Sequence, residues 1–215
     1  MLRIGALETV AHTWLPGLLS RFAARFPNAT LELDSDITPR LRDHLLRGTL
    51  DCAILSEEIT PGFIDNHRIA NFTMAWVTGP SLASKLPVHR PLSLPDIAEH
   101  PIISFHRESG VYRNIAQGVS HCANLRVSYF SSMGAMLELA RAGFGSALLP
   151  IAVVQGDLQS GRLVLLPMEP QPAPLPLVAS VRLEPASPMA GALVRMAQEA
   201  CDDFVAHAGA AVTTA

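Results

Sequence analysis

The first residues of the chain combine two hydrophobic patterns, a short apolar run and, directly after it, a periodic segment. Residues 2–6 have the length and apolar character of a buried strand. Beyond the turn at residues 7–9, apolar side chains recur three or four positions apart, so they share one face of a helix: Leu15, Leu18, Leu19, Phe22 and Phe26. The pattern predicts a strand that runs straight into one amphipathic helix.

The same arrangement is repeated twice in the residues that follow. Residues 30–33 alternate as a strand and lead to Thr38, whose hydroxyl is expected to cap a helix that begins at Pro39 and ends at Gly48. Residues 51–55 are a third strand, short and apolar as in a parallel sheet that is covered on both faces. Alternating strands and helices of this kind indicate a doubly wound α/β unit.

A second lobe of the same kind follows a strand-rich segment at residues 63–77. Its first predicted strand, residues 102–105, leads into a turn that begins with His106. Its next strand, residues 125–130, leads through Ser131 and Ser132 into a helix at residues 133–142. The chain closes with a long helix and a tail rich in alanine and threonine, which we expect to be disordered over residues 208–215.

The turns between strands and helices are the expected sites of chemistry. The first N–H groups of a helix have no partner inside the helix and carry a partial positive charge, which suits a small anion. Thr9 adds a hydroxyl at the first of these turns. Each polar residue also has a purely structural interpretation, because Thr38, Ser131 and Ser132 can serve as helix caps and Glu8 as a first-turn carboxylate that favours the helix dipole.

Composition limits the classes of protein to which the pattern can belong. The chain has 215 residues, 49% of them hydrophobic, which is enough for one large domain or two small lobes with a core. A net charge of −3 without basic clusters argues against a nucleic-acid surface on this part of the protein. The sequence holds no apolar run near the roughly 18–20 residues of a membrane span and no signal-peptide pattern at its start. Three widely spaced cysteines are typical of reduced thiols in a cytoplasm.

Catalytic and metal-binding motifs are absent from the sequence. There is no Gly-x-Ser-x-Gly elbow, no His-Glu-x-x-His or Cys-x-x-Cys pair and no Walker-type glycine loop. Residues 143–145 lack the third glycine of a dinucleotide fingerprint. Asp34 and Asp36 are better explained as a solvated turn than as a cation site. We therefore expect neither an enzyme nor a resident cofactor or metal.

Two stretches of the chain resemble a known family, the effector-binding domains of LysR-type bacterial transcriptional regulators. Residues 2–55 are similar to the start of such a domain and include a Gly-x-x-Asp-x-Ala-Ile run at residues 48–54. The segment LELARAGFGSALLP at residues 137–150 is similar to the helix, Gly-x-Gly turn and crossing strand of the family's second lobe. The resemblance covers about residues 2–205, with the elements in the family's order.

The resemblance implies an α/β fold of the type 2 periplasmic-binding-protein class. In this fold two Rossmann-like lobes are joined by two crossing strands, and a small molecule is held between the lobes. Lobe I would comprise residues 1–69 and 150–207, and lobe II residues 70–149, with the crossings near residues 70–72 and 147–149. A winged helix-turn-helix and a linker helix precede this domain in the family, so we interpret the chain as the sensor part without them.

The resemblance also implies that the effector is bound at the turns of both lobes. The expected contacts are Leu7, Glu8, Thr9 and Thr38 in lobe I, and His106, Ser131 and Ser132 in lobe II. Many family members have small polar residues where this chain has Leu7 and Val10, and Glu8 adds a negative charge there. An effector with an apolar or cationic portion is therefore favoured over a strongly anionic one.

The implied function is sensing in the bacterial cytoplasm. A small-molecule effector would close the lobes, and the change would reach DNA only through the missing N-terminal domain, with no part played by a membrane. The expected assembly is a homodimer, or a tetramer in the full-length protein, in which the helix at residues 14–26 pairs antiparallel with the partner's helix at residues 133–142. The alternative is a free-standing solute-binding receptor of a transport system, which shares the fold.

Overall fold

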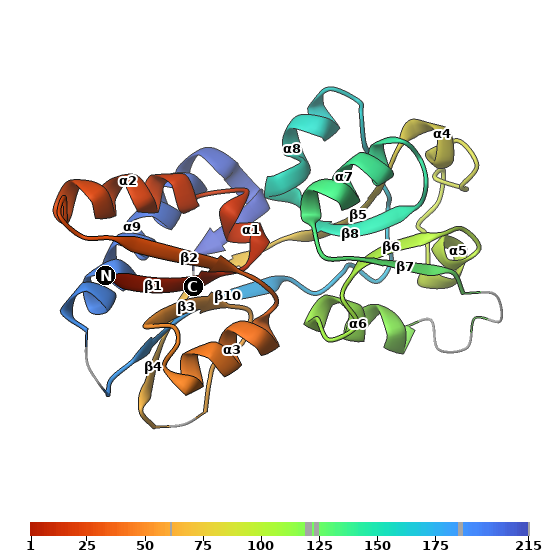
Figure 1. The fold of residues 1–215 in the computed structure, drawn as a ribbon. Helices are drawn as coiled ribbons and strands as arrows, with labels where there is room; N and C mark the ends of the chain where they lie inside the picture. Colours follow the sequence, from red (N-terminus) through yellow and green to blue (C-terminus); the bar gives the residue numbers. More distant parts are fainter. Residues whose placement is uncertain (61, 119–121, 123–124, 185–186, 215) are drawn as a thin grey trace. The chain divides into compact units, whose positions relative to one another are not determined.

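The chain forms two compact units, each built on its own β-sheet. The computed structural model describes residues 1–60, 62–118, 122, 125–184 and 187–214. Unit 1 comprises Met1–Phe72 and Leu175–Ala215, and unit 2 comprises Thr73–Pro174. Figure 1 shows the two sheets with their helices. The chain therefore passes from one unit to the other after Phe72 and again after Pro174.

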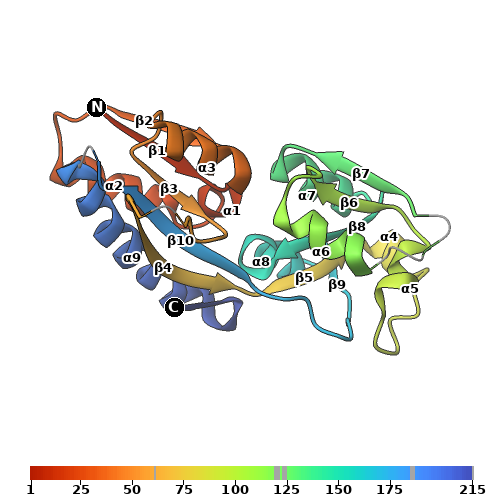
Figure 2. The ribbon, with the colours of Figure 1, turned by 90° about the horizontal axis from the view of Figure 1, so that it is seen from below.

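Unit 1 holds a six-stranded sheet in the order β11-β4-β10-β3-β1-β2. Strand β1 is parallel to β2 and β3, whereas β10 is antiparallel to β3 and β4. Helices α2 and α9 cover one face of this sheet and α3 covers the other (Figures 1 and 2). The elements are β1 (Leu2–Ala6), α1 (Glu8–Ala11), α2 (Leu15–Arg25), β2 (Leu31–Ser35), α3 (Thr38–Arg47), β3 (Cys52–Leu55), β4 (Ile64–Phe72), β10 (Leu175–Arg182), α9 (Pro188–Ala208), the 3-10 helix η1 (Gly209–Ala211) and β11 (Val212–Thr214).

The predicted first helix is in fact two helices. The short α1 follows β1 directly, and the chain turns at residues 12–14 before α2 begins. Pro16 explains the interruption, because proline has no N–H to donate and its ring clashes with the carbonyl four residues earlier. It is well placed in the first turn of a helix, so α2 restarts at Leu15 and buries Leu18 and Phe22 as expected.

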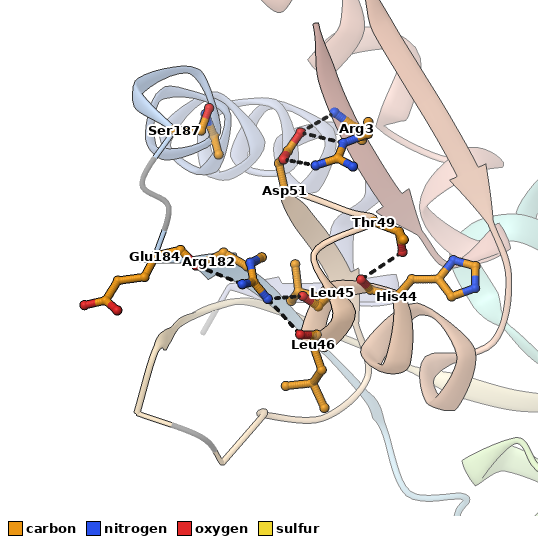
Figure 3. A network of polar contacts seen from close by, with 10 residues as sticks. Arg3, His44, Leu45, Leu46, Thr49, Asp51, Arg182, Glu184 and Ser187 are labelled. Atoms are coloured by element: carbon orange, nitrogen blue, oxygen red, sulfur yellow. Dashed lines mark hydrogen bonds and ion pairs between the residues drawn. The ribbon is translucent and has the colours of Figure 1, made fainter.

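The C-terminal end of α3 is fixed to the sheet by Arg182 of β10 (Figure 3). One guanidinium nitrogen of Arg182 donates to the carbonyl oxygens of Leu45 and Leu46, both at 2.8 Å. Gly48 ends the helix with a φ of 76°, a left-handed conformation that glycine adopts without strain. This end of the helix is thus satisfied, and its N-terminal end points to the opposite edge of the sheet.

A second arginine joins the start of β1 to the turn before β3. Three Arg3 nitrogens donate to the Asp51 carboxylate: the backbone N–H at 2.8 Å, Nη2 at 2.7 Å and Nε at 3.4 Å (Figure 3). Burial alone would raise the pKa of Asp51, but the hydrogen bonds and charge of Arg3 outweigh it and lower the pKa below its usual value. The pair holds two neighbouring parallel strands in register.

Unit 2 holds a five-stranded sheet in the order β7-β6-β8-β5-β9. Strand β6 is parallel to β7 and β8, and β5 is antiparallel to β8 and β9. Helices α7 and α8 lie on one face, and α6 lies on the other (Figure 1). The elements are β5 (Met74–Thr78), α4 (Pro80–Ala83), α5 (Leu94–Ala98), β6 (Ile102–Phe105), α6 (Gly110–Gly118), β7 (Val127–Phe130), α7 (Met133–Arg141), β8 (Ser146–Pro150), α8 (Ile151–Gln159) and β9 (Val164–Leu165).

The second passage between the units lies later in the chain than the expected crossing at residues 147–149. Residues 150–174 belong to unit 2 rather than to the first lobe. The physical reason is that β9 pairs with β5, and that Val154 and Leu163 are buried in the core of unit 2 beneath α7. The sequences of the helix α8 and of the two-residue strand β9 gave no sign of the sheet to which they attach.

Residues 209–214 form a 3-10 helix and a strand, whereas disorder was expected over residues 208–215. After α9 and η1, β11 pairs antiparallel with Ala70–Phe72 of β4. Val212 retains only 1% exposure and Ala211 only 5%, so the tail buries apolar surface at the edge of the sheet. The alanine- and threonine-rich composition concealed this strand because one buried valine is too little for a recognisable alternation.

The close approach of backbone at Gly145 predicts a clear stability difference between two glycines. A Cβ at Gly145 would collide with the Pro101 carbonyl group, whereas a Cβ at Gly156, on the exposed side of α8, would have no neighbour within 4 Å. We expect Gly145→Ala to destabilise the fold by about 2 kcal/mol through overpacking. Gly156→Ala should stabilise it by about 0.5–1 kcal/mol, since alanine favours helices. Urea denaturation would test both, and equal stabilities would contradict the packing at Gly145.

The buried carboxylate of Asp157 should contribute more to stability than the exposed one of Glu138. Both pair with Arg141, but the Asp157 side chain is 4% exposed and the Glu138 side chain 74%. Asp157 accepts from Arg141 at 2.6 and 2.9 Å and pairs with Arg162 at 2.8 Å. We expect Asp157→Asn to cost about 2 kcal/mol, because a neutral amide loses the charge-assisted hydrogen bonds that Arg141 donates to the buried carboxylate, and Glu138→Gln to change stability by about 0.5 kcal/mol or less. The same denaturation measurement would reveal a reversed order, which would refute this assignment.

Candidate functional site

Both sheets contain a point where the direction of strand addition reverses. In unit 1, β2 and β3 lie on opposite sides of β1, and in unit 2, β7 and β8 lie on opposite sides of β6. The helices that connect these strands therefore lie on opposite faces of the sheet, and they separate from each other at the carboxyl end of the central strand. Open α/β sheets bind ligands at such a crevice. The candidate site residues are those that follow β1, β2 and β3 in unit 1, and β6 and β7 in unit 2.

The turn after β1 carries three of the predicted residues. The backbone N–H of Leu7 donates to the Ile54 carbonyl at 3.2 Å, which places this turn beside the end of β3. Glu8 is half-buried in the first turn of α1. Thr9 is 5% exposed, and its carbonyl oxygen accepts from the Thr13 hydroxyl at 2.7 Å. Leu7 and Thr9 are therefore held in place by contacts within unit 1.

Thr38 lies at the same edge, in a role that differs from the predicted helix cap. The capping position belongs to Ile37, and Thr38 is the first residue of α3. The Thr38 hydroxyl instead accepts from the backbone N–H of Ser56 at 3.1 Å and lies 2.8 Å from the Ser56 hydroxyl. It turns towards the sheet because Ser56 directly follows β3. Ser56 joins the site, and its position right after a buried strand was a signal available in the sequence.

In unit 2, His106 and Ser131 follow the paired residues Phe105 and Phe130, so the structure brings these two turns together. His106 is half-buried, and its Nδ1 accepts from the Glu108 N–H at 3.4 Å and lies 3.8 Å from the Glu108 carboxylate. Ser132 is exposed and caps α7 by accepting from the Ala135 N–H at 3.4 Å. Ser131 is exposed beside it.

An arginine and two tyrosines at this edge were missed in the sequence. The Arg107 guanidinium carbon lies 4.6 Å from the centroid of the Tyr129 ring, and Tyr112 meets that ring edge-on at 5.2 Å between centroids. Arg107 comes from the turn after β6, Tyr129 from β7 and Tyr112 from α6. Their separation along the chain hid this cluster, although Arg107 is adjacent to the predicted His106.

The environment keeps the Tyr129 phenol protonated. Burial raises the pKa of Tyr129, and the hydrogen bond and charge of Tyr112 raise it further, while nearby Arg107 partly opposes this rise. Ser104 pairs in register with Tyr129, so both side chains project from the same face of the sheet. The Ser104 hydroxyl is buried, at 1% residue exposure, and has no hydrogen-bond partner among the described residues.

No metal centre emerges in the described part of the chain, and two of its thiols are buried. Within it, no group of three or more His, Cys, Asp or Glu side chains is arranged to hold a metal ion. The three cysteines are free thiols, and burial raises the pKa of Cys201 to about 12 and that of Cys52 further. Among the same residues, no helix has the length and apolar character to cross a membrane.

Comparison with known proteins agrees with this architecture. The family model described as LysR substrate binding domain matches residues 1–202. The HTH-type transcriptional regulator YofA of Bacillus velezensis (strain DSM 23117 / BGSC 10A6 / LMG 26770 / FZB42) is 30% identical over 159 residues, which are 72% of this chain and 51% of that protein. DgdR of Burkholderia cepacia, also an HTH-type transcriptional regulator, is 28% identical over 182 residues, 82% of this chain and 55% of that protein. The chain thus spans about half the length of these curated relatives.

The structural match confirms the expected fold. Full-length LysG from Corynebacterium glutamicum, solved with bound effector Arg, matches with a TM-score of 0.77 at 23% identity, covering 94% of this chain and 68% of that one. The fold is thus of the type 2 periplasmic-binding-protein class, as the resemblance implied. Because the family model accounts for nearly the whole sequence, from residue 1 to residue 202, the chain belongs to the LysR substrate binding domain family.

Proposed function

We propose that the chain is the sensor domain of a LysR-type transcriptional regulator that binds a small-molecule effector. The observation that carries this proposal is the reversal of strand order in both sheets, beside β1 and beside β6, in a member of this family. Polar groups gather at the carboxyl ends of both central strands, where α/β sheets bind ligands. The relatives named as HTH-type transcriptional regulators support this role over that of a free-standing solute-binding receptor.

The proposed effector contacts are the turns that the sequence singled out. In unit 1 they are Leu7, Glu8, Thr9 and Thr38, extended by Ser56. In unit 2 they are His106, Ser131 and Ser132. The Thr38 and Ser56 hydroxyls already bond to each other, so a ligand that engages this pair meets two fixed dipoles. Such preorganised groups lose little entropy on binding.

Effector binding would act by favouring one arrangement of the two units over another. A ligand shifts such an equilibrium only by the difference between its affinities for the two arrangements. Two chain segments, after Phe72 and after Pro174, connect the units and would carry the change. The proposed target of this change is a DNA-binding part outside the chain, since a net charge of −3 gives this domain little attraction for phosphate.

The proposed assembly is a homodimer, or a tetramer in the full-length regulator, working in the cytoplasm without a membrane partner. Helix α2 of one copy would pair with α7 of the other, because each helix lies on the outside of its own sheet and leaves one face uncovered by its unit (Figure 1). Closed two-fold pairing is the commonest symmetry of soluble oligomers. We propose sensing without catalysis, with neither a cofactor nor a metal.

A thermal-shift screen of small metabolites tests the sensor role and the unit 1 contacts together. At about a hundred times its Kd, an effector stabilises the native state by about 2.7 kcal/mol, and this should raise the Tm by roughly 5–10 °C. We expect Thr9→Val and Thr38→Val to bind about tenfold more weakly, which removes about 1.4 kcal/mol, or roughly half of that rise. Each shift is measured from the same variant without ligand, because Thr38→Val also loses its bond to the Ser56 amide.

Thr49→Val is the matched control, since the Thr49 hydroxyl donates to the His44 carbonyl at the opposite end of α3. This variant should keep the full shift. A compound that stabilises the wild type, Thr9→Val and Thr38→Val equally would remove both threonines from the site. If the screen of small metabolites yields no compound that stabilises the chain, the sensor role itself is contradicted.

A further inference from the structure

The cluster of Arg107, Tyr129 and Tyr112 in unit 2 points to the chemical class of the effector. The Arg107 guanidinium lies on the face of the Tyr129 ring, at 4.6 Å from its centroid. A cation held over an aromatic ring is attracted by the ring's negative face, which restrains the otherwise flexible side chain. Stacked in this way, a planar guanidinium keeps its N–H edge free to meet a carboxylate with two parallel hydrogen bonds.

The charge of Arg107 is not neutralised by its neighbours. Within the described residues, no carboxylate forms an ion pair with Arg107, and the adjacent Glu108 instead lies 3.8 Å from the His106 ring nitrogen. Arg141 and Arg162 in the same unit, by contrast, both pair with Asp157. An unpaired guanidinium at the carboxyl edge of β6 and β7 therefore attracts an anion to this unit.

The hydroxyl groups of Tyr129 and Ser104 differ in their hydrogen bonding. The Tyr129 hydroxyl is engaged by Tyr112, whose hydrogen bond raises the pKa of Tyr129. On the same face of the sheet, the buried Ser104 hydroxyl has no partner among the described residues. An unsatisfied buried hydroxyl in a native protein calls for an explanation, such as a missing bound partner.

We propose that the effector carries a carboxylate and that Arg107, held over the Tyr129 ring, binds it in unit 2. This inference rests on the proposed sensor function and names its ligand class. It revises the expectation of an effector that is not strongly anionic, which was drawn from Leu7, Val10 and Glu8 alone. Those residues belong to unit 1, and the carboxylate is assigned to unit 2 alone. The proposed class of effector is a small carboxylic acid.

The test compares carboxylic acids with their neutral primary amides on the whole chain. The probes are benzoate with benzamide, phenylacetate with phenylacetamide, and L-leucine with L-leucinamide, each pair at one concentration. We expect at least one acid to raise the Tm more than its amide does. Arg107→Gln should weaken the binding of that acid by about ten- to hundredfold in calorimetric titration, as the loss of a charged bidentate contact predicts.

Arg126→Gln is the matched control for the loss of one positive charge in the same unit. Arg126 is exposed and donates to the Glu99 carbonyl before β6, at the opposite edge of the sheet, so this variant should bind the acid like the wild type. Arg107 is exposed as well, and unliganded Arg107→Gln should therefore melt near the wild-type temperature.

Three results would overturn the inference. The first is that no acid stabilises the chain more than its amide, the second is that Arg107→Gln keeps wild-type affinity, and the third is that Arg126→Gln loses as much affinity as Arg107→Gln. Suppose that a neutral compound stabilises the wild type and does so less in Thr9→Val and Thr38→Val. The sensor role would then be supported, and only the proposal of a carboxylate effector would fail. The two proposals therefore fail by different outcomes.

Discussion

The handedness of the connections between parallel strands is the constraint on which the rest of this structure depends. Right-handed crossovers send the connection from β1 to β2 and the connection from β2 to β3 to opposite faces of the sheet, because the strands are added on opposite sides of β1. The same holds around β6 in unit 2. The helices must therefore part at the carboxyl end of the central strand, and polar turns collect there without any special motif.

Much of this plan could be read from the sequence, because it follows from local patterns. Short apolar runs marked β1, β3 and β6, and Gly48 marked the end of α3, where its φ of 76° requires a residue without a side chain. The predicted turn residues do lie at the carboxyl edges of their own sheets. The resemblance to LysR-type sensor domains was confirmed over residues 1–202.

Other features escaped prediction because they depend on contacts between distant segments. Thr38 looked like a cap, but the amide of Ser56 draws its hydroxyl towards the sheet. Residues 150–174 join unit 2 because β9 pairs with β5. A strand of two residues is too short to be recognised in the sequence. The contact between Arg107 and Tyr129 arises only when β7 lies beside β6. A periodic pattern also cannot show that Pro16 divides one amphipathic face into two helices.

The ordered C-terminal strand also determines how the sheet of unit 1 meets its surroundings. β11 pairs with β4 and is itself the outermost strand of the sheet, and at three residues it offers another chain only a short edge for pairing. The opposite border is β2, whose Glu32 is exposed and whose Asp34 is half-buried. The carboxylates on this edge strand repel those of a second copy of the chain, which discourages edge-to-edge aggregation. Unit 1 thus protects its two borders differently, one by the shortness of its outer strand and the other by charge.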